Sequence, residues 1–511
     1  MYRKGMVIVM SKKDVVLIAF YNTKALGVRY LANALKASGY VPHIIFLKGF
    51  NSATPAKATA EEIRLLGELI DRISPLFVGM SVMSSLYLET TYDANRVVRE
   101  RKLPLFWGGV YASLETRRAV QYCDYVMRGE GEEAIVDVAK ALTSGGNIEE
   151  IANLAWLDGK GNYRENPLRP LVEDIDRCGY PEVDGGNMYV IDNDKIREGD
   201  PQTTAFTYEL TASRGCPFRC TYCSAPNLRR MYDGKGQYLR FRSVDSVMEE
   251  LGKAKERIPK LRVVHFWDEV FSTKDEWVNE FSSRYKKEIG IPFRIWSHPL
   301  AVNEKLITKL VDAGLHQAVV GIQSGSPSVR RDTFHRPETQ EQIIEASRIL
   351  SKCRVPVVYY DLMLCHPFES LEQLKETFLL CMELVPPFRL NIHGLNFLPG
   401  TDIVQMALDQ GIHTQEELDS MMYSSIKEQY DRYWGSAAKD FKKASDKNIW
   451  VDMIYLTQFP QIREKLKELA ARVEAGEAGT DADIRKLKKK MERKLLIDRY
   501  TDKIKLVLKI K

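Results

Sequence analysis

The stretch SRGCPFRCTYCSAP, residues 213–226, contains three cysteines in the spacing C-x₃-C-x₂-C: Cys216, Cys220 and Cys223. A structural zinc site normally has four protein ligands, and so does a complete iron–sulfur cluster. The whole chain has only 8 cysteines among 511 residues, so the cluster indicates metal or catalytic chemistry rather than a disulfide scaffold. The stretch therefore raises the question of whether a fourth ligand is missing or is supplied by a bound molecule.

Downstream of the cysteines, strand patterns alternate with amphipathic helical patterns. The strand preceding the cysteines lies in residues 204–216, and five more are expected at 263–271, 293–300, 318–326, 357–368 and 389–401. Six such units predict a partial (β/α)₆ barrel over residues 205–413, whose reactive groups should lie at the carboxyl ends of the strands. The cysteine loop follows the first strand, so it should lie in the mouth of the barrel.

Upstream of the cysteines, apolar runs typical of buried parallel strands occupy residues 15–20, 43–48, 76–82, 103–109 and 125–130. Helical patterns separate them, so residues 1–150 predict a doubly wound, Rossmann-like α/β domain with the flavodoxin strand order. We expect a linker, or alternatively a small covering segment, over residues 151–204, which are rich in Asp, Gly and Pro. Residues 414–511 should form a charged, mainly helical segment that ends in a strand over 504–510.

The overall composition excludes some classes of function. The 74 basic and 69 acidic side chains leave a net charge of +5, which is too balanced to indicate a nucleic-acid partner. The first residues do not resemble a signal peptide, and no run approaches the roughly 20 apolar residues of a membrane-spanning helix. We therefore expect a cytoplasmic protein that binds no nucleic acid.

The cysteine motif, with Tyr222 directly before its last cysteine, resembles that of the radical SAM superfamily. The resemblance implies that Cys216, Cys220 and Cys223 hold a [4Fe–4S] cluster and that S-adenosylmethionine (SAM) binds the remaining iron. Reduction of the cluster then cleaves SAM to a 5′-deoxyadenosyl radical. The alternative is a zinc site completed by a distant Cys or His. The resemblance also implies a set of contacts to SAM: Tyr222, Asp268, Glu269, Gln323, Ser324, Leu398 and Pro399.

The first domain resembles a cobalamin-binding domain fused to a radical SAM domain. The usual motif after its first strand is D-x-H-x-x-G, and here Asn22, Lys24 and Gly27 stand in its three positions. A protonated lysine has no lone pair, so Lys24 should not ligate cobalt. The contacts expected for cobalamin follow the strand ends: Asn22, Lys24, Leu26, Gly27, Ser81, Met83, Ser84, Ser85, Gly108, Gly109, Tyr111, Gly129 and Glu130. A flavodoxin-like domain without a cofactor is the alternative.

The fifth barrel strand departs from the pattern of the family. Relatives often read I-I-G-L-P-G-E-T, whereas residues 363–370 read MLCHPFES. Cys365 and His366 are candidates for moving a proton or hydrogen atom, together with Tyr359 on the same strand. The alternative is that Cys365 simply packs as a small hydrophobic residue.

The combined resemblance implies a cobalamin-dependent radical SAM methyltransferase. It would move a methyl group from SAM through methylcobalamin to an unactivated carbon, or a phosphinate phosphorus, of a small molecule or lipid. Its electron donor would be a flavodoxin or ferredoxin. Alternatives are cyclisation, ring contraction or oxidation without methyl transfer, a methylthiotransferase, and a non-catalytic cobalamin or SAM sensor. The basic tail is either a solvated surface or a peripheral contact for an anionic partner such as a membrane.

Overall fold

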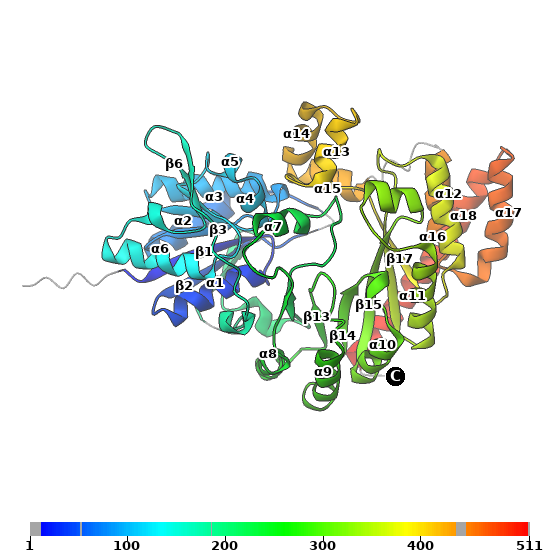
Figure 1. The fold of residues 1–511 in the computed structure, drawn as a ribbon, viewed down its shortest axis with the longest axis horizontal. Helices are drawn as coiled ribbons and strands as arrows, with labels where there is room; N and C mark the ends of the chain where they lie inside the picture. The colour runs from blue at the N-terminus through cyan, green and yellow to red at the C-terminus, as the bar shows by residue number, and fades with distance from the viewer. Residues whose placement is uncertain (1–11, 52–53, 185, 436–445, 509–511) are drawn as a thin grey trace, which may run out of the picture. The chain divides into compact units, whose positions relative to one another are not determined.

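The computed structural model describes residues 12–51, 54–184, 186–435 and 446–508. The described residues form two compact units, and Figure 1 shows the course of the chain coloured from the N-terminus to the C-terminus. Unit 1 comprises the described residues up to Thr203 together with Arg230–Gln237, and unit 2 comprises Thr204–Arg229 and the residues from Tyr238 onward. A short piece that follows the cysteines in sequence therefore belongs to the first unit.

Unit 1 is built on a nine-stranded sheet in the order β7-β6-β5-β4-β3-β1-β2-β8-β9. Its strands are β1 Asp14–Phe20, β2 Val41–Leu47, β3 Val78–Ser81, β4 Leu105–Gly108, β5 Tyr125–Met127, β6 Leu154–Leu157, β7 Tyr163–Glu165, β8 Met188–Asp192 and β9 Lys195–Glu198. Strands β1 to β5 pair in parallel, which confirms the doubly wound α/β domain and its flavodoxin order. β1 is buried from Val15 to Phe20, as expected for a strand covered on both faces.

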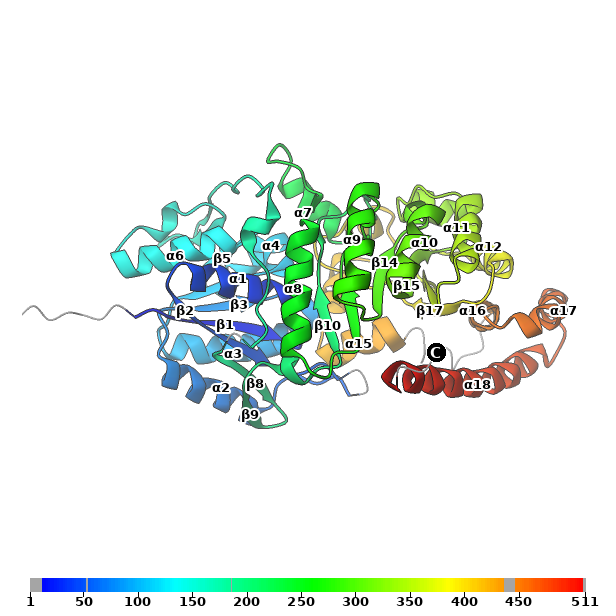
Figure 2. The ribbon, with the colours of Figure 1, turned by 90° about the horizontal axis from the view of Figure 1, so that it is seen from below.

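The helices of unit 1 are α1 Leu26–Ala37, α2 Ala60–Ile73, α3 Leu88–Glu100, α4 Val110–Leu114, α5 Thr116–Ala119 and α6 Glu132–Ser144. Helices α1 and α6 cover one face of the sheet, where Val15, Leu17 and Ala19 of β1 join their core, and α2 and α3 lie on the other side (Figure 2). A capping box between Thr59 and Glu62 starts α2.

The expectation of a linker over residues 151–204 is wrong, because this segment completes the sheet at both edges. The hairpin of β6 and β7 adds antiparallel to β5. At the opposite edge β8 pairs in parallel with β2, and β9 returns antiparallel to β8. These strands have 3 to 5 residues each, and the segment contains more residues of the types that favour turns than residues in strands. Its local sequence pattern is therefore too weak to distinguish the strands from a loop.

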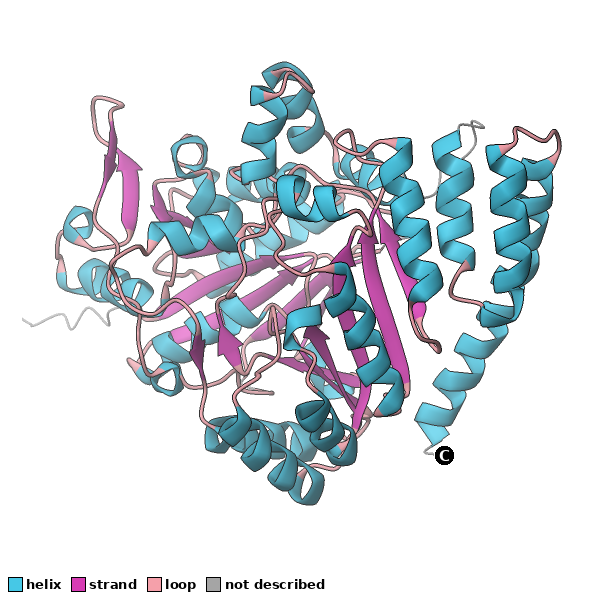
Figure 3. Cartoon of the chain, turned by 45° about the vertical axis from the view of Figure 1, so that its right-hand side comes forward, coloured by secondary structure: helices cyan, strands magenta, loops and turns pink. Residues whose placement is uncertain are grey.

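Unit 2 contains a six-stranded parallel sheet in the order β10-β13-β14-β15-β16-β17. Its strands are β10 Thr207–Leu210, β13 Val263–Phe266, β14 Phe293–Ser297, β15 Leu315–Gln323, β16 Val357–Met363 and β17 Arg389–His393, with a separate small pair, β11 Ser213–Arg214 and β12 Arg240–Phe241. The main helices that connect them are α7 Ala225–Met231, α8 Val244–Arg257, α9 Asp275–Glu288, α10 Glu304–Ala313, α11 Gln340–Lys352 and α12 Leu371–Glu383. The order confirms the predicted six-unit partial barrel, and Figure 3 shows helices along its outer side.

The C-terminal part of unit 2 is helical, as predicted. Its helices are α13 Asp402–Asp409, α14 Gln415–Tyr423, α15 Ile426–Gly435, α16 Asp446–Leu456, α17 Arg463–Glu474 and α18 Thr480–Leu508. The strand expected over residues 504–510 is wrong as far as Leu508, because α18 continues to that residue, and Ile510 lies outside the described residues. A helix already propagating over many turns outweighs a short alternating pattern at its end. Among the described helices, none is both long and apolar enough to cross a membrane.

Candidate functional site

The entry to the cysteine loop is held by two tight contacts. Gly215 has a φ of +94°, and a Cβ there would lie 2.4 Å from the carbonyl oxygen of Tyr238, so only glycine fits. Just before it, the backbone N–H of Ala212 donates to both oxygens of Asp268 at 3.1 Å, and the Ser213 hydroxyl donates to the same carboxylate. Asp268 therefore ties the end of the first barrel strand to the end of β13.

The middle of the loop is anchored through Thr221, which is fully buried. Its backbone N–H donates to the carbonyl of Phe334 at 3.2 Å, and its hydroxyl donates to the carbonyl of Thr333 at 2.6 Å. Its own carbonyl accepts from the backbone N–H of Ile403 at 3.0 Å. The residues between Cys220 and Cys223 are thus fixed between the segment that follows β15 and the start of α13.

The three thiols suit a cluster of several irons. Burial raises the pKa of Cys216 to about 12, with further increases from Glu269 and the two other thiols, and burial raises that of Cys223 as well. A buried thiol with a raised pKa becomes a thiolate at neutral pH only when a bound cationic centre stabilises the charge. The described residues contain no group of three or more His, Cys, Asp or Glu side chains that could hold a metal ion. A [4Fe–4S] cluster has a different requirement, since each thiolate binds its own iron.

A buried arginine that the sequence analysis missed lies against the loop. Nη1 of Arg336 lies 3.7 Å from Sγ of Cys220 and donates to the Tyr222 hydroxyl at 3.1 Å, while Nη2 donates to the carbonyl of Gly321 at 2.5 Å. The side chain also pairs with Glu338 at 2.7 Å. A permanent positive charge beside a thiolate stabilises it, so Arg336 belongs to the site electrostatically. In the sequence, the only indication of this role was that Arg336 is a charged residue in the loop after a barrel strand.

The polar chain continues from Arg336 to a second aromatic of the loop. His298 Nε2 lies 3.2 Å from a Glu338 oxygen, and its ring stacks on Phe218 with the centroids 3.7 Å apart. Burial would raise the pKa of Glu338, but His298 and Arg336 lower it to about 2. The cysteine loop is therefore held in place by the packing of Phe218 on His298 and by the contacts of Arg336.

The residues expected to contact SAM lie in three different settings. Gln323 ends β15 with a φ of +69°, and the buried Ser324 next to it accepts a hydrogen bond from the N–H of Ser326 at 3.1 Å. Glu269 is exposed, whereas both oxygens of Asp268 are used in holding the loop. The carbonyl of Leu398 accepts from the N–H of Thr401 at 3.2 Å, and Pro399 is buried.

Asp268 should make stability depend on pH. Burial raises the pKa of Asp268 to about 7, far above that of an unfolded carboxyl. The folded state then binds the proton more tightly, so this contribution to stability is present at low pH and is lost as the pH rises through 7. Between pH 5 and 8 we expect the free energy of unfolding to fall by about 2 kcal/mol more in the native protein than in Asp268→Asn. Urea unfolding measures this difference, and equal slopes for the two proteins would contradict it; the exposed Asp275→Asn is the control.

The candidate catalytic residues are close in sequence but differ in environment. Tyr359 lies on β16, and its hydroxyl accepts from Arg389 at 3.2 Å. Cys365 is partly exposed, has a φ of +59° and donates its backbone N–H to Glu369 at 2.9 Å. His366 is only 2% exposed and packs 5.0 Å from the ring of Phe334. Of the neighbouring pair, Cys365 is the more accessible to a bound molecule.

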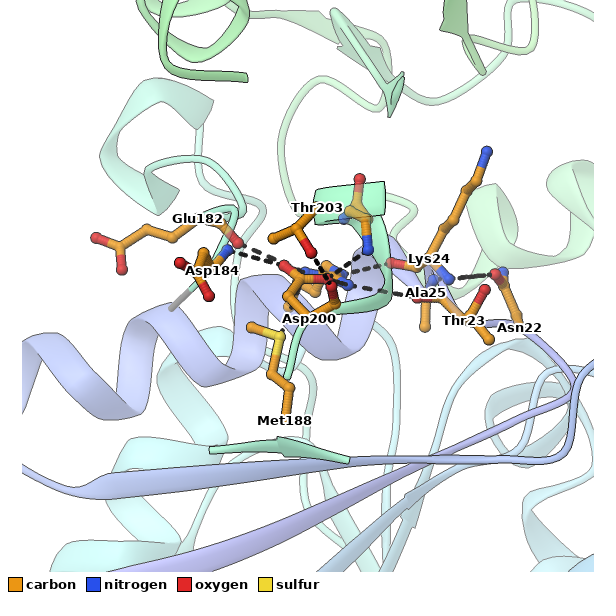
Figure 4. A network of polar contacts seen from close by, with 11 residues as sticks. Asn22, Thr23, Lys24, Ala25, Glu182, Asp184, Met188, Asp200 and Thr203 are labelled. Atoms are coloured by element: carbon orange, nitrogen blue, oxygen red, sulfur yellow. Dashed lines mark hydrogen bonds and ion pairs between the residues drawn. The ribbon is translucent and has the colours of Figure 1, made fainter. Parts of the chain in front are cut away.

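In unit 1, the loop after β1 is fixed by its own side chains. The Asn22 side-chain oxygen accepts from the backbone N–H groups of Lys24 at 2.8 Å and Ala25 at 3.1 Å. The Lys24 side chain points away from this network (Figure 4). Gly27 lies in the first turn of α1, and nothing lies within 4 Å of the position of a Cβ there, so the surface beside it is open. A large ligand could approach the backbone there.

A buried ion pair supports this loop from behind. Arg29 donates from Nη1 and Nη2 to the two oxygens of Asp200 at 2.9 and 2.8 Å, and both side chains are at most 1% exposed. Nε of Arg29 donates to the carbonyl of Lys24 at 2.7 Å, and Nη2 donates to that of Thr23 at 3.3 Å. Figure 4 shows the carbonyls of the loop converging on this network. Asp200 comes from the segment that was expected to be a linker.

The remaining residues expected to bind cobalamin are partly occupied by protein. A Cβ on Gly109 would lie 2.8 Å from the carbonyl of Val82, and one on Gly129 would lie 2.0 Å from the Tyr232 hydroxyl. That hydroxyl also accepts from the N–H of Glu130 at 2.7 Å. The other expected contacts range from buried to open: Ser85 and Tyr111 are buried, Leu26, Ser81, Ser84 and Gly108 are half-buried, and Met83 is exposed. Tyr232 was missed because it follows the cysteine motif in sequence.

Unit 1 also has a cavity of about 810 Å³ that reaches Tyr232. Residues of α1 and α6 line it together with the segment from Arg169 to Glu182. Of the residues expected to bind cobalamin, only Glu130 lies in its wall. The cavity is therefore separate from the strand ends of β1 and β3.

A doubly wound domain followed by a six-stranded barrel, with three cysteines after the first barrel strand, defines a class of enzymes. The family descriptions that match are the B12 binding domain over residues 12–139 and the Radical SAM superfamily over residues 210–381. The chain belongs to the cobalamin-binding radical SAM enzymes, whose cofactors are SAM, a [4Fe–4S] cluster and cobalamin.

Three relatives illustrate the family. An uncharacterized methyltransferase of Pyrococcus horikoshii is 27% identical over 56% of this chain, and the match spans 60% of that protein. A cytidylyl-2-hydroxyethylphosphonate methyltransferase of Streptomyces wedmorensis is 24% identical over 64% of this chain and 67% of its own length. An anaerobic magnesium-protoporphyrin IX monomethyl ester cyclase of Rubrivivax gelatinosus is 23% identical over 70% of this chain and 62% of its own length.

Two solved structures have the same fold. The cobalamin-dependent SAM radical enzyme OxsB with aqua-cobalamin bound matches with a TM-score of 0.66 at 14% identity, covering 96% of this chain and 81% of its own. The radical SAM methyltransferase TsrM from Kitasatospora setae, with tryptophan and a SAM analogue bound, matches with a TM-score of 0.62 at 18% identity, over 78% of this chain and 76% of its own. At these identities the likeness concerns the fold.

Proposed function

We propose that this protein is a cobalamin-dependent radical SAM methyltransferase that acts on an unactivated carbon, or a phosphinate phosphorus, of its substrate. The observation that carries the proposal is the combination, in one chain, of a B12-binding domain with a three-cysteine loop at the carboxyl end of a barrel strand. A carbon without an acidic proton cannot be activated by acid–base side chains alone, so cofactors must supply the chemistry. The relatives named as methyltransferases support this choice.

The residues of the barrel would hold and shield the iron–sulfur centre. When bound, the cluster and SAM supply the 5′-deoxyadenosyl radical, and cobalamin carries the methyl group. Cys216, Cys220 and Cys223 would bind the irons, and Arg336 would offset negative charge beside Cys220. Gln323 and Ser324, at the end of β15, would orient SAM together with Tyr222. Thr221 would keep the loop in place.

The loop after β1 would receive cobalamin without supplying a ligand to cobalt. Lys24 carries a protonated amine with no lone pair, and the Asn22 oxygen is occupied by two backbone N–H groups. The open surface beside Gly27 would accommodate the corrin edge. Cys365 and Tyr359 would be the groups nearest to the substrate that can exchange a proton or hydrogen atom.

We place the reaction in the cytoplasm, with a flavodoxin or ferredoxin as the electron donor. A one-electron carrier would supply the electrons that an iron–sulfur centre needs for this chemistry when bound. The substrate would be a small molecule or a lipid. The sequence of α18 is rich in basic residues, which leaves a peripheral membrane contact as the route to a lipid, and vesicle binding by the full chain would test it.

The test of the function is an anaerobic reconstitution with iron, sulfide and cobalamin, followed by incubation with reductant and SAM labelled in its methyl group. We expect about four irons and four sulfides per chain, corrin absorbance, 5′-deoxyadenosine, and label transferred to the bound cobalamin. A chain that binds the cofactors but releases no 5′-deoxyadenosine would contradict an enzymatic role. An iron count near eight would instead indicate a methylthiotransferase with a second cluster.

A second function deserves the same experiment because cyclase relatives also match over 70% of this chain. A cyclisation, ring contraction or oxidation would consume SAM as a source of the radical alone. It would release 5′-deoxyadenosine while leaving the labelled methyl group out of cobalamin and out of the product. The distribution of label therefore separates the two functions.

A further inference from the structure

The inner face of the barrel sheet is unusually polar. Barrel interiors are normally filled by branched apolar side chains. Here the residues that alternate with the outward-packed Tyr208, Phe266 and Tyr360 are charged or polar over five strands: Glu209, His265, Arg294, Tyr359, Asp361, Asn391 and His393. The outward residues contact the helices, as Tyr208 shows by donating to Glu250 of α8 at 2.7 Å. The inward set therefore needs an explanation other than packing.

Arg294 of β14 is the central member of this set. Its Nη1 lies 3.5 Å from Nε2 of His265, and because an arginine has no lone pair, the histidine must be the acceptor. His265 Nδ1 then carries the hydrogen and faces Glu209 at 3.9 Å. Within the described residues, Arg294 makes no ion pair within 4.0 Å, and its buried Nε has no hydrogen-bond partner.

Arg242, a buried arginine of the same unit, forms the full set of contacts that Arg294 lacks. Arg242 forms an ion pair with Glu250 and donates to the carbonyls of Thr211 at 3.1 Å and Ser246 at 3.0 Å. A buried donor without a partner costs free energy, so folded proteins normally pair such groups. Arg294 therefore has donor capacity that a bound molecule could satisfy.

The carboxylates that face Arg294 form no ion pair with it within 4.0 Å in the described part of the chain. Burial lowers the pKa of Arg294, and Tyr359, Glu209 and Asp361 oppose this effect from across the sheet. Burial also raises the pKa of Asp361, which accepts from Asn391 at 2.8 Å, and burial lowers the pKa of His393 beside it. Asp361 is therefore easier to neutralise than an exposed carboxyl, whereas a guanidinium stays charged.

An aromatic surface adjoins the guanidinium. Arg294 Cζ lies 5.1 Å from the ring centre of Trp296, and Trp296 stacks on Trp267 with ring centres 4.2 Å apart. Trp267 is 45% exposed although it directly follows β13. An exposed indole, stacked on the ring that adjoins a cation, favours a molecule with a flat apolar part and a negative group.

We propose that Arg294 binds an oxyanion of the substrate, a carboxylate or a phosphate-type group, with the adjoining part of the molecule lying on Trp267. This deepens the proposed function by naming the substrate class, an organic anion rather than a hydrocarbon-like lipid tail. The identity of the anion as substrate rests on the proposed function, but the binding site itself does not.

The test uses the full chain as purified and three probes: inorganic phosphate, acetate and benzoate. Binding is followed by calorimetry and by tryptophan fluorescence at concentrations up to about 50 mM, which fill a site of millimolar Kd. We expect at least tenfold weaker binding in Arg294→Gln, about the cost of one charge-assisted hydrogen bond. Arg284→Gln, on the exposed surface of α9, is the control and should bind as the native protein does. Trp267→Ala should weaken benzoate but not phosphate or acetate.

Arg294→Lys guards against a folding defect, because it keeps the charge and should retain most of the phosphate affinity. Equal binding by Arg294→Gln and the native protein would overturn the proposal. Absence of binding by the native protein for all three probes would overturn it too, and would leave Arg294 with a purely structural role. Formation of 5′-deoxyadenosine is measured separately on the same preparations. A failure of the radical chemistry therefore stays distinguishable from a failure of anion binding.

Discussion

Replacing Cys220 by alanine should leave the protein without its iron–sulfur centre and without any cleavage of SAM. Cys220 is the most buried of the three loop thiols, and Nη1 of Arg336 lies 3.7 Å from its sulfur. With two thiolates left, the cluster loses one of its three protein ligands and becomes open to solvent and oxidation. We expect the iron content of the anaerobically reconstituted protein to fall from about four per chain to near zero. Release of 5′-deoxyadenosine should fall to background.

Iron and sulfide assays measure the first effect directly, and they do not depend on turnover. The matched control is Cys353→Ser, since Cys353 lies at the end of α11 and its sulfur contacts the Thr308 hydroxyl at 3.4 Å. This variant should keep its full iron content. A Cys220→Ala protein that retained four irons would show that the loop is not the cluster site. Circular dichroism should show that both variants remain folded.

Breaking the Arg29–Asp200 pair should have the largest effect on stability. Both groups are buried, and removing one leaves the other charged and unpaired, which typically costs about 3–5 kcal/mol. We therefore expect Arg29→Met to lower the free energy of unfolding by about that amount in urea. Cobalamin should also be retained less well, because Arg29 holds the carbonyls of Thr23 and Lys24. Corrin absorbance after gel filtration measures this second effect.

The control for this pair is Arg72→Met, which removes an exposed ion pair with Glu198 and should cost less than about 1 kcal/mol. The double variant Arg29→Met/Asp200→Leu should be more stable than Arg29→Met alone, because it leaves no unpaired charge. A loss below about 1 kcal/mol in Arg29→Met would contradict the prediction.

The same pair should respond to acid. Burial would raise the pKa of Asp200, but its bonds from Arg29 and from two backbone N–H groups lower it below the ordinary value. A depressed pKa contributes stability that is present above the unfolded value and is lost as the pH falls through the folded value. The difference between the native protein and Arg29→Met should therefore shrink below about pH 4.

Much of the architecture could be predicted locally. The run from Val15 to Phe20 is apolar throughout, because a parallel strand covered on both faces has no polar side. The six barrel units were recognisable from their strand patterns and from the regular helical spacing between them. The strands β6 to β9 were not recognisable in the sequence. Short strands at the edge of a sheet form where a neighbouring strand offers hydrogen bonds, more than where their own residues favour a strand.

The sequence by itself determined the class of the protein: buried strand runs, and three cysteines spaced to share one loop, are properties of neighbouring residues. Only the tertiary structure decided which polar groups support the sites. Arg29 and Asp200 are 171 residues apart, and Arg336 and Cys220 are 116 apart. Arg294 faces residues of other strands in the same way. A buried charged group pairs with the oppositely charged or polar group that the fold places within a few ångströms of it. Because that partner is distant in the sequence, no local sequence pattern predicts the pair.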